Sequence, residues 1–210
     1  MPILVLNGSL NPITLGHVKL LENAKTLAER LFGPVTKIYV SPTCDAYPYK
    51  SLLPAFHRIA MINLALSSSP LNNLTEINTD EVLSPTFSPT YQVMKSLKQK
   101  HPTDQILLVC GTDLINGMLN RNYWPEFNVR SIFNEIELLC FNRPNGNGSI
   151  SAEKIVQNIK NDFLKEFEAK IHITEEIIGE MSSSAAREGR TDFLDEKVAQ
   201  YMKENGLCQK

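Results

Sequence analysis

The sequence predicts an α/β fold in which a doubly wound, mostly parallel sheet carries helices on both faces. Short apolar segments typical of buried strands alternate along the chain with longer segments whose apolar residues recur at helical spacing. The length of 210 residues suits a single domain, spanning 1–210, with a sizeable core. Because the strands of such a sheet end at a shared edge, we expect the ligand site at that edge.

The first third of the chain predicts three strands and two helices. A buried strand is expected over Ile3–Leu6, and a helix is expected from about Leu15 to the stop signal at Gly33-Pro34. The elements expected next are a strand at Lys37–Val40, a helix at Ala55–Leu66 and a strand at Leu74–Ile77.

The rest of the chain continues the alternation. The segment Gln105–Cys110 is continuously apolar after its first residue, which is typical of a central strand in a parallel sheet. The segment Asn142–Ser149 is rich in Pro, Gly and Asn and predicts a loop. The other expected elements are helices at Thr90–Lys100, Ser151 to about Phe167 and Phe193–Asn205, and strands at Glu137–Phe141 and Ile171–Thr174.

Composition and charge exclude several classes of protein. A formal net charge of −2 and an isoelectric point near 6.1 favour neither nucleic acid nor an anionic membrane as a partner. Apolar runs stay far below the roughly 20 residues of a membrane span, and the N-terminus does not resemble a secretory signal. The cysteines, at 44, 110, 140 and 208, have no CxxC spacing, so we expect neither a zinc site nor a disulfide scaffold. We therefore expect the cytosol or the nucleus as the location, and the oligomeric state stays open, a homo-oligomer included.

A first candidate site follows the first predicted strand, where Thr14, Gly16 and His17 open a helix. Amides at a helix start favour phosphate, and side chains three positions apart can face one point. Glycine at 8 and 16 permits close approach of a backbone or a ligand. No Gly-Lys-Ser/Thr sequence follows, so this segment is not a Walker loop. The alternative interpretation is a capping threonine beside a surface histidine.

A second candidate site lies near the other end of the chain, where Ser182, Ser183 and Ser184 precede a helical stretch that contains Arg187. Hydroxyls, free amides and a guanidinium fork together suit a phosphate group. Serine runs also serve as plain caps or turns, which is the alternative here. Two such segments predict that the distant ends of the chain converge on one polyphosphate.

The two segments resemble the TxGH and ISSTxxR elements of nucleotidyltransferases. More specifically, the chain resembles the eukaryotic branch of the nicotinamide/nicotinate mononucleotide adenylyltransferase family. The other segments that carry the resemblance are Gly8–Thr14, Ser41–Lys50, Leu52–Arg58, Leu108–Leu114 and Asn122–Trp124. The resemblance implies a Rossmann-like fold and transfer of AMP from ATP to nicotinamide mononucleotide, or to nicotinate mononucleotide. The products would be NAD, or its deamido form, and pyrophosphate.

The resemblance also implies a role for each matching residue. His17, Lys50 and Arg187 would contact the phosphates during transfer, while Mg²⁺ would be held mainly by ATP and not by a protein metal site. ATP binding is implied for Gly8, Ser9, Thr14, Gly16, Gly111, Asp113, Ser183 and Ser184. The residues implied to line the binding site of the mononucleotide are Thr90, Tyr123, Trp124 and Arg143.

One departure from the family pattern concerns the acceptor. Asp80 stands where the family has an aromatic residue expected to stack on the pyridine ring, a loss on the order of 1 kcal/mol. A carboxylate there would repel nicotinate more than the neutral amide, which favours nicotinamide. Three alternatives remain open: a related adenylyl- or cytidylyltransferase with another phosphorylated acceptor, a slow ATPase with a drifted acceptor pocket, and a non-catalytic nucleotide-binding protein.

Overall fold

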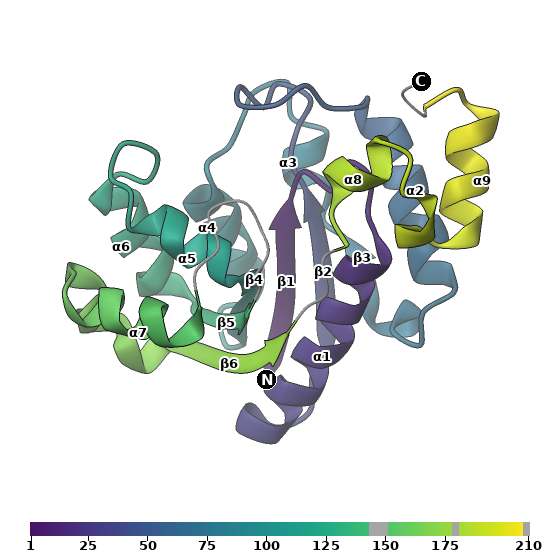
Figure 1. Cartoon of the computed structure of the whole chain (residues 1–210). Helices are drawn as coiled ribbons and strands as arrows, with labels where there is room; N and C mark the ends of the chain where they lie inside the picture. The colour runs from purple at the N-terminus through teal and green to yellow at the C-terminus, as the bar shows by residue number, and fades with distance from the viewer. Residues whose placement is uncertain (143–150, 178–180, 208–210) are drawn as a thin grey trace.

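The computed structural model describes residues 1–142, 151–177 and 181–207. Within these ranges, six parallel strands form one sheet in the order β3-β2-β1-β4-β5-β6 (Figure 1). The strands are β1 (Pro2–Gly8), β2 (Lys37–Pro42), β3 (Thr75–Ile77), β4 (Gln105–Gly111), β5 (Glu137–Asn142) and β6 (Ile171–Ile177). The predicted α/β fold with a parallel sheet is confirmed.

The order of the strands creates a switch point between β1 and β4. From β1 the chain moves outward through β2 to β3, and it then returns to β4 on the other side of β1. In register, Leu4 lies between Ile38 of β2 and Leu107 of β4. Sheets of this kind bind ligands in the crevice at the carboxyl ends of the strands beside the switch point.

Helices cover both faces of the sheet, as Figure 1 shows. Alternate residues of β1 enter the two cores: Leu4 and Leu6 face one core, and Ile3 and Val5 face the other. The first core is covered by α1 (Leu15–Phe32), α2 (Ala55–Ser67), α8 (Ser183–Arg187) and α9 (Glu196–Glu204). The second is covered by α4 (Thr90–Lys100), α5 (Thr112–Met118), α6 (Glu126–Glu135) and α7 (Ala152–Lys160).

Two predicted helices have different bounds in the structure. The helix from Ser151 ends at Lys160, and a 3₁₀ helix at Phe163–Lys170 follows it. The restart occurs because the Asp162 carboxylate accepts a hydrogen bond from the Leu164 amide at 3.1 Å. The closing helix begins at Glu196 because Asp195 caps it, so Phe193 belongs to a preceding 3₁₀ turn.

Several short elements were not predicted. The helices α5 and α6 occupy the stretch between β4 and β5, and the four-residue helix α3 (Thr79–Val82) follows β3. Strand β6 continues to Ile177, three residues beyond its predicted end. Of the predicted loop after β5, Asn142 belongs to the strand and residues 143–149 lie outside the described part of the chain.

Candidate active site

The segment that leads into α8 packs against the loop between β1 and α1. The Ser183 hydroxyl donates to the Pro12 carbonyl at 2.8 Å, and the Thr14 hydroxyl donates to the Met181 carbonyl at 3.2 Å. The Arg187 guanidinium donates to the Asn11 carbonyl. These partners lie 167 to 176 positions apart in the sequence. We call residues 9–17 and 181–187 together the clasp, and it confirms the predicted convergence of the two segments (Figure 1).

Gly16 brings the two halves of the clasp together. A Cβ at this position would lie 3.0 Å from both the Cβ and the carbonyl oxygen of Met181. The sequence predicted a ligand against this glycine, whereas the structure places Met181 there. Gly8 differs, because a Cβ at the end of β1 would have no atom within 4 Å. Gly16 therefore shapes the site through a protein contact, and Gly8 borders open space.

His17 is held in one tautomer by the first turn of α1. The backbone amide of Thr14 donates to the imidazole Nδ1 at 3.0 Å, and the Thr14 hydroxyl lies 2.8 Å from the same nitrogen. An amide N–H can only donate, so Nδ1 is the acceptor and the proton of the neutral ring resides on Nε2. The half-buried ring therefore carries an N–H donor on the side away from Thr14.

A fully buried arginine supports the loop between β1 and α1. Arg58 of α2 donates to the Ser9 carbonyl at 3.1 Å, to the Leu53 carbonyl at 2.9 Å and to the Asp45 carboxylate at 2.8 Å. Asn11 strengthens the same junction, since its side-chain oxygen accepts from the Leu53 amide at 3.1 Å. The sequence predicted no site role for Arg58, although it lies within one of the segments that carry the family resemblance.

A second polar cluster lies at the ends of β1 and β2. The Asn7 side chain donates to the Ser41 carbonyl at 3.0 Å and to Glu81 at 3.2 Å, and it accepts from the Thr90 hydroxyl at 3.3 Å. Glu81 is only 2% exposed, and this burial raises the pKa of its carboxyl to about 7. Hydrogen bonds from Asn7 and from the Cys44 backbone oppose the rise. Of this cluster, only Thr90 was predicted as a site residue.

Unsatisfied polar atoms also mark the carboxyl edge. Among the described residues, three buried side-chain oxygens have no hydrogen-bond partner: Thr43 Oγ1, Glu81 Oε1 and Asn142 Oδ1. Thr43 directly follows β2, Glu81 lies beyond β3, and Asn142 ends β5. Buried polar atoms are normally paired, so their gathering at one edge of the sheet favours a polar ligand there.

The β4 side of the edge carries the residues predicted for the nucleoside. Gly111 ends β4 and directly precedes α5, and Asp113 is half-buried in the first turn of that helix. Both therefore lie at the switch point, next to β1. Their predicted contact with the ATP ribose stays a prediction.

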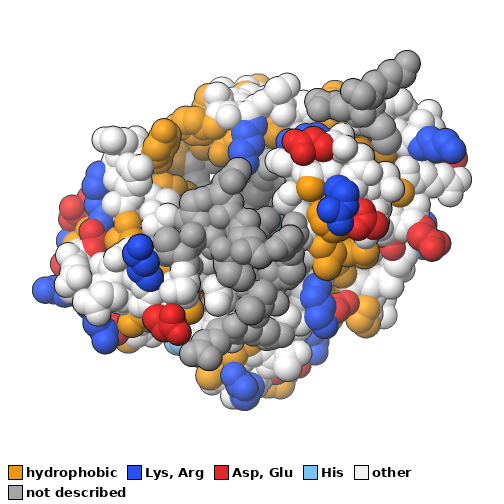
Figure 2. Space-filling model, in the orientation of Figure 1, with side chains coloured by type: hydrophobic (Ala, Val, Ile, Leu, Met, Phe, Trp, Pro, Cys, Tyr) orange, Lys and Arg blue, Asp and Glu red, His pale blue; other side chains and the backbone are white. Residues whose placement is uncertain are grey.

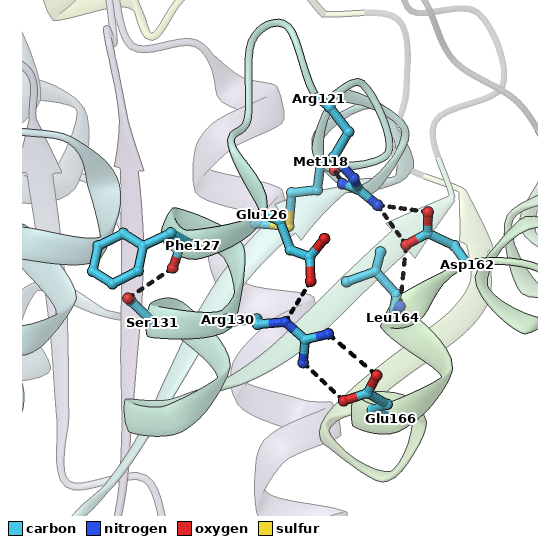
Figure 3. A network of polar contacts seen from close by, with 9 residues as sticks. All are labelled: Met118, Arg121, Glu126, Phe127, Arg130, Ser131, Asp162, Leu164 and Glu166. Atoms are coloured by element: carbon cyan, nitrogen blue, oxygen red, sulfur yellow. Dashed lines mark hydrogen bonds and ion pairs between the residues drawn. The ribbon is translucent and has the colours of Figure 1, made fainter.

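The turn between α5 and α6 carries Tyr123 and Trp124, and a charged network holds it in place (Figure 3). Arg121 donates to the Met118 carbonyl and to both carboxylate oxygens of Asp162, the latter at 2.5 Å. Its guanidinium also lies 4.3 Å from the centre of the Phe163 ring. Figure 3 shows a second arginine, Arg130, which donates to Glu126 at 2.7 Å and to Glu166 at 2.8 Å. Tyr123 itself is 70% exposed, and Trp124 is half-buried.

The remaining predicted site residues lie in different surroundings. The Ser184 hydroxyl accepts from Arg187 at 3.3 Å within the clasp. Lys50 is exposed on the loop after β2, and Arg143 lies outside the described residues. Asp80 pairs with Lys100 of α4 at 2.6 Å, and this hydrogen-bonded pairing lowers the pKa of its carboxyl. The Lys100 ammonium offsets the negative charge by which Asp80 was expected to favour nicotinamide, and that preference stays a prediction.

The surface shows no concentration of one charge on the face drawn in Figure 2. Lys and Arg side chains are interspersed with Asp and Glu around the described part of this face. No described helix combines the length and the apolar character that crossing a bilayer requires.

Comparisons with known proteins agree with this architecture. The model of the cytidylyltransferase-like family matches residues 5–189. A nicotinamide/nicotinic acid mononucleotide adenylyltransferase from Oryza sativa subsp. japonica is 29% identical, over 98% of this chain and 85% of the relative. Nicotinamide/nicotinic acid mononucleotide adenylyltransferase 1 from Bos taurus is 26% identical, over 98% of this chain and 88% of the relative.

A solved structure shares the fold. It is a Plasmodium falciparum nicotinic acid mononucleotide adenylyltransferase complexed with NaAD, which superposes with a TM-score of 0.74 at 19% sequence identity. The superposition covers 98% of this chain and 96% of that one. The match to the family model, over residues 5–189, covers most of the chain and includes both halves of the clasp. The chain belongs to the cytidylyltransferase-like family.

Proposed function

We propose that this chain transfers AMP from ATP to a pyridine mononucleotide, nicotinamide or nicotinate mononucleotide. The products are NAD or its deamido form, together with pyrophosphate. The observation that carries the proposal is the clasp, which joins the start of α1 to α8 through Ser183, Arg187 and Thr14. The names of the rice and bovine relatives support this choice of acceptor.

The clasp suits a triphosphate undergoing attack. An oxygen of the acceptor phosphate attacks the α-phosphorus of ATP, and the bond to the β-phosphate oxygen breaks as pyrophosphate leaves. The attacking oxygen is already anionic, so catalysis consists of positioning and charge stabilisation. The Nε2–H of His17 and the guanidinium of Arg187 supply hydrogen bonds to the phosphate oxygens in this proposal.

Magnesium fits this site as a companion of ATP. The clasp offers hydroxyls, amides and a guanidinium, which are phosphate partners and not a metal cage. In the described part of the chain, no cluster of three or more His, Cys, Asp or Glu side chains could hold a metal ion. When bound through the ATP phosphates, Mg²⁺ supplies neutralisation of their negative charge.

The acceptor belongs on the side of the second polar cluster. Three aromatic rings follow β2 and α3 along the chain: Tyr47, Tyr49 and Phe87 contact one another edge-on, with ring centres 5.3 to 6.3 Å apart. Burial raises the pKa of Tyr47, and the negative charges of Tyr49 and Glu81 add to the rise. These rings offer the aromatic surface that Asp80 does not provide, so the acceptor side retains a place for a pyridine ring.

A product assay tests the proposed function. The protein is incubated with ATP, Mg²⁺ and each of the two pyridine mononucleotides, and dinucleotide and pyrophosphate are quantified. We expect pyrophosphate only when a mononucleotide is present. ATP hydrolysis without an acceptor would favour the slow ATPase, and product with phosphopantetheine or a sugar phosphate would favour a related transferase. ATP binding without any product would favour a non-catalytic protein.

Replacing Gly16 by valine is expected to raise the KM for ATP about tenfold, which corresponds to an overpacking cost of 1 to 2 kcal/mol. The new Cβ would meet Met181 at 3.0 Å and push the two halves of the clasp apart. Steady-state kinetics with varied ATP measures the change. Leu31→Val is the control, because it introduces the same side chain at an exposed position near the end of α1, outside the clasp. An unchanged KM in a folded Gly16→Val protein would contradict the role of the clasp.

A further inference from the structure

We infer that Glu81, Asn7 and Thr90 form a hydrogen-bond relay that makes the Thr90 hydroxyl an acceptor and selects nicotinamide mononucleotide over nicotinate mononucleotide. The inference rests on the proposed function and deepens it, since it concerns the substituent of the acceptor's ring. Because Asp80 forms an ion pair with Lys100, we assign a preference for nicotinamide mononucleotide to this relay and not to Asp80.

The orientation of the Asn7 amide is the first step. One end of this amide lies 3.0 Å from the Ser41 carbonyl oxygen and 3.2 Å from Glu81 Oε2. A carbonyl and a carboxylate can only accept, so the amide nitrogen must be at this end. When Glu81 is protonated, its proton can reside on Oε1, which has no other partner among the described residues, and Oε2 still accepts.

The orientation of the Asn7 amide in turn fixes the direction of the Thr90 hydroxyl proton. With the Asn7 nitrogen turned toward Glu81, the amide oxygen faces Thr90 Oγ1 at 3.3 Å. That oxygen cannot donate, so the single hydroxyl proton of Thr90 is directed at it. The remaining lone pairs of Oγ1 are then available only to a donor. Asn7 and Thr90 are half-buried whereas Glu81 is buried behind them, so the relay ends at a group that a ligand can reach.

The two candidate acceptors differ in the group that such an acceptor atom recognises. A carboxamide carries an NH₂ group that can donate to Thr90 Oγ1. A carboxylate carries only acceptor oxygens, so it loses this hydrogen bond and places negative charge beside the lone pairs. A site built to bind a donor discriminates strongly against an analogue that lacks it.

The charge of Glu81 adds a dependence on pH. Burial raises the pKa of Glu81 to about 7, so this carboxyl is mostly neutral at pH 6 and mostly ionised at pH 8. Ionisation places a negative charge behind the relay and disfavours the acid acceptor more than the amide. The ionisable groups that face Glu81 are Arg58, which pairs with Asp45 at 2.8 Å, and Tyr47, whose pKa is raised above its usual value by burial.

The pH profile is the first test. kcat/KM is measured with each mononucleotide at pH 6, 7 and 8 for the natural protein and for Glu81→Gln. We expect the amide-to-acid ratio to rise roughly three- to tenfold over this range in the natural protein and to stay flat in the variant. The phosphates of the two acceptors titrate alike and cancel in the ratio. Glu76→Gln, at an exposed position on β3, is the matched control and keeps the rise.

Variants of Thr90 are the second test. Thr90→Val is expected to lower the amide-to-acid ratio about tenfold through loss of the amide reaction, while Thr90→Ser preserves it. Thr26→Val, on the exposed side of α1, controls for loss of a threonine hydroxyl elsewhere. Equal losses with both acceptors, or a pH-independent ratio in the natural protein, would overturn the relay.

The two proposals fail in different ways. If neither mononucleotide yields a dinucleotide, the proposed function is wrong. The relay is then tested by calorimetric binding of each mononucleotide without ATP, where the same ratios and the same pH dependence are expected. If both dinucleotides form but the amide-to-acid ratio of kcat/KM is the same in the Thr90 and Glu81 variants as in the natural protein, the transfer reaction is confirmed and the relay is wrong.

Discussion

Replacing His17 by alanine is expected to lower kcat by about 10² to 10³, the loss typical of removing one donor to the charge that develops in a transition state. The structure supports this magnitude, because the Thr14 amide leaves the imidazole proton on Nε2 and so aims a fixed donor. The fold is expected to survive with a loss of about 1 kcal/mol, since the ring also caps the first turn of α1. Steady-state kinetics and thermal unfolding measure the two effects.

Two further variants make this test specific. His17→Gln places an amide nitrogen near the position of Nε2, so we expect it to recover part of the lost rate. His101→Ala removes an imidazole at the end of α4 that bonds to Tyr39, and it is expected to leave kcat unchanged. Normal turnover by His17→Ala would reject the role assigned to the imidazole.

Replacing Arg187 is expected to weaken the use of ATP, with kcat/KM reduced about 100-fold by alanine and about tenfold by lysine. The guanidinium contacts the Asn11 carbonyl and the Ser184 hydroxyl together, which aligns both halves of the clasp. An ammonium group keeps the charge but lacks the planar fork, so lysine rescues only part of the function. ATP titrations at a saturating acceptor concentration measure the loss.

Arg190 provides the matched control for Arg187. It lies three positions further along the chain and pairs with Asp192 at 2.9 Å, with both side chains more than half exposed. Arg190→Ala is expected to leave the KM for ATP unchanged. If Arg187→Ala behaved like this control, the guanidinium would have no part in binding the triphosphate.

The sequence predicted the sheet better than the short helices. Strands such as Gln105–Cys110 are short and almost entirely apolar, which is typical of buried strands. Their alternation with helical segments along the chain implied a parallel sheet. The helix after Ser151 was extended too far because its apolar spacing continues beyond the Asp162 cap. The signal for α6 was present, since Val129, Ile132 and Phe133 share one face, but the pattern spans only ten residues.

For the candidate site, the sequence predicted the residues of the clasp but not the residues that support them. Thr14, His17 and Arg187 belong to segments with characteristic spacing, so they could be predicted without a structure. Asn7 and Glu81 lie 74 positions apart, and only the folding of β1 beside α3 brings them together. The pairing of Asp80 with Lys100, 20 positions further along the chain, was not predicted for the same reason.

The distance along the chain between the two halves of the clasp also affects when the site can form. Contacts between residues separated by 167 to 176 positions close long loops, and such non-local contacts are associated with slow folding. A polypeptide synthesised as far as residue 180 contains all six strands of the described sheet but lacks Ser183 and Arg187. A chain of that length holds only one half of the clasp, so it cannot make the contacts that Ser183 and Arg187 form with residues 11 and 12.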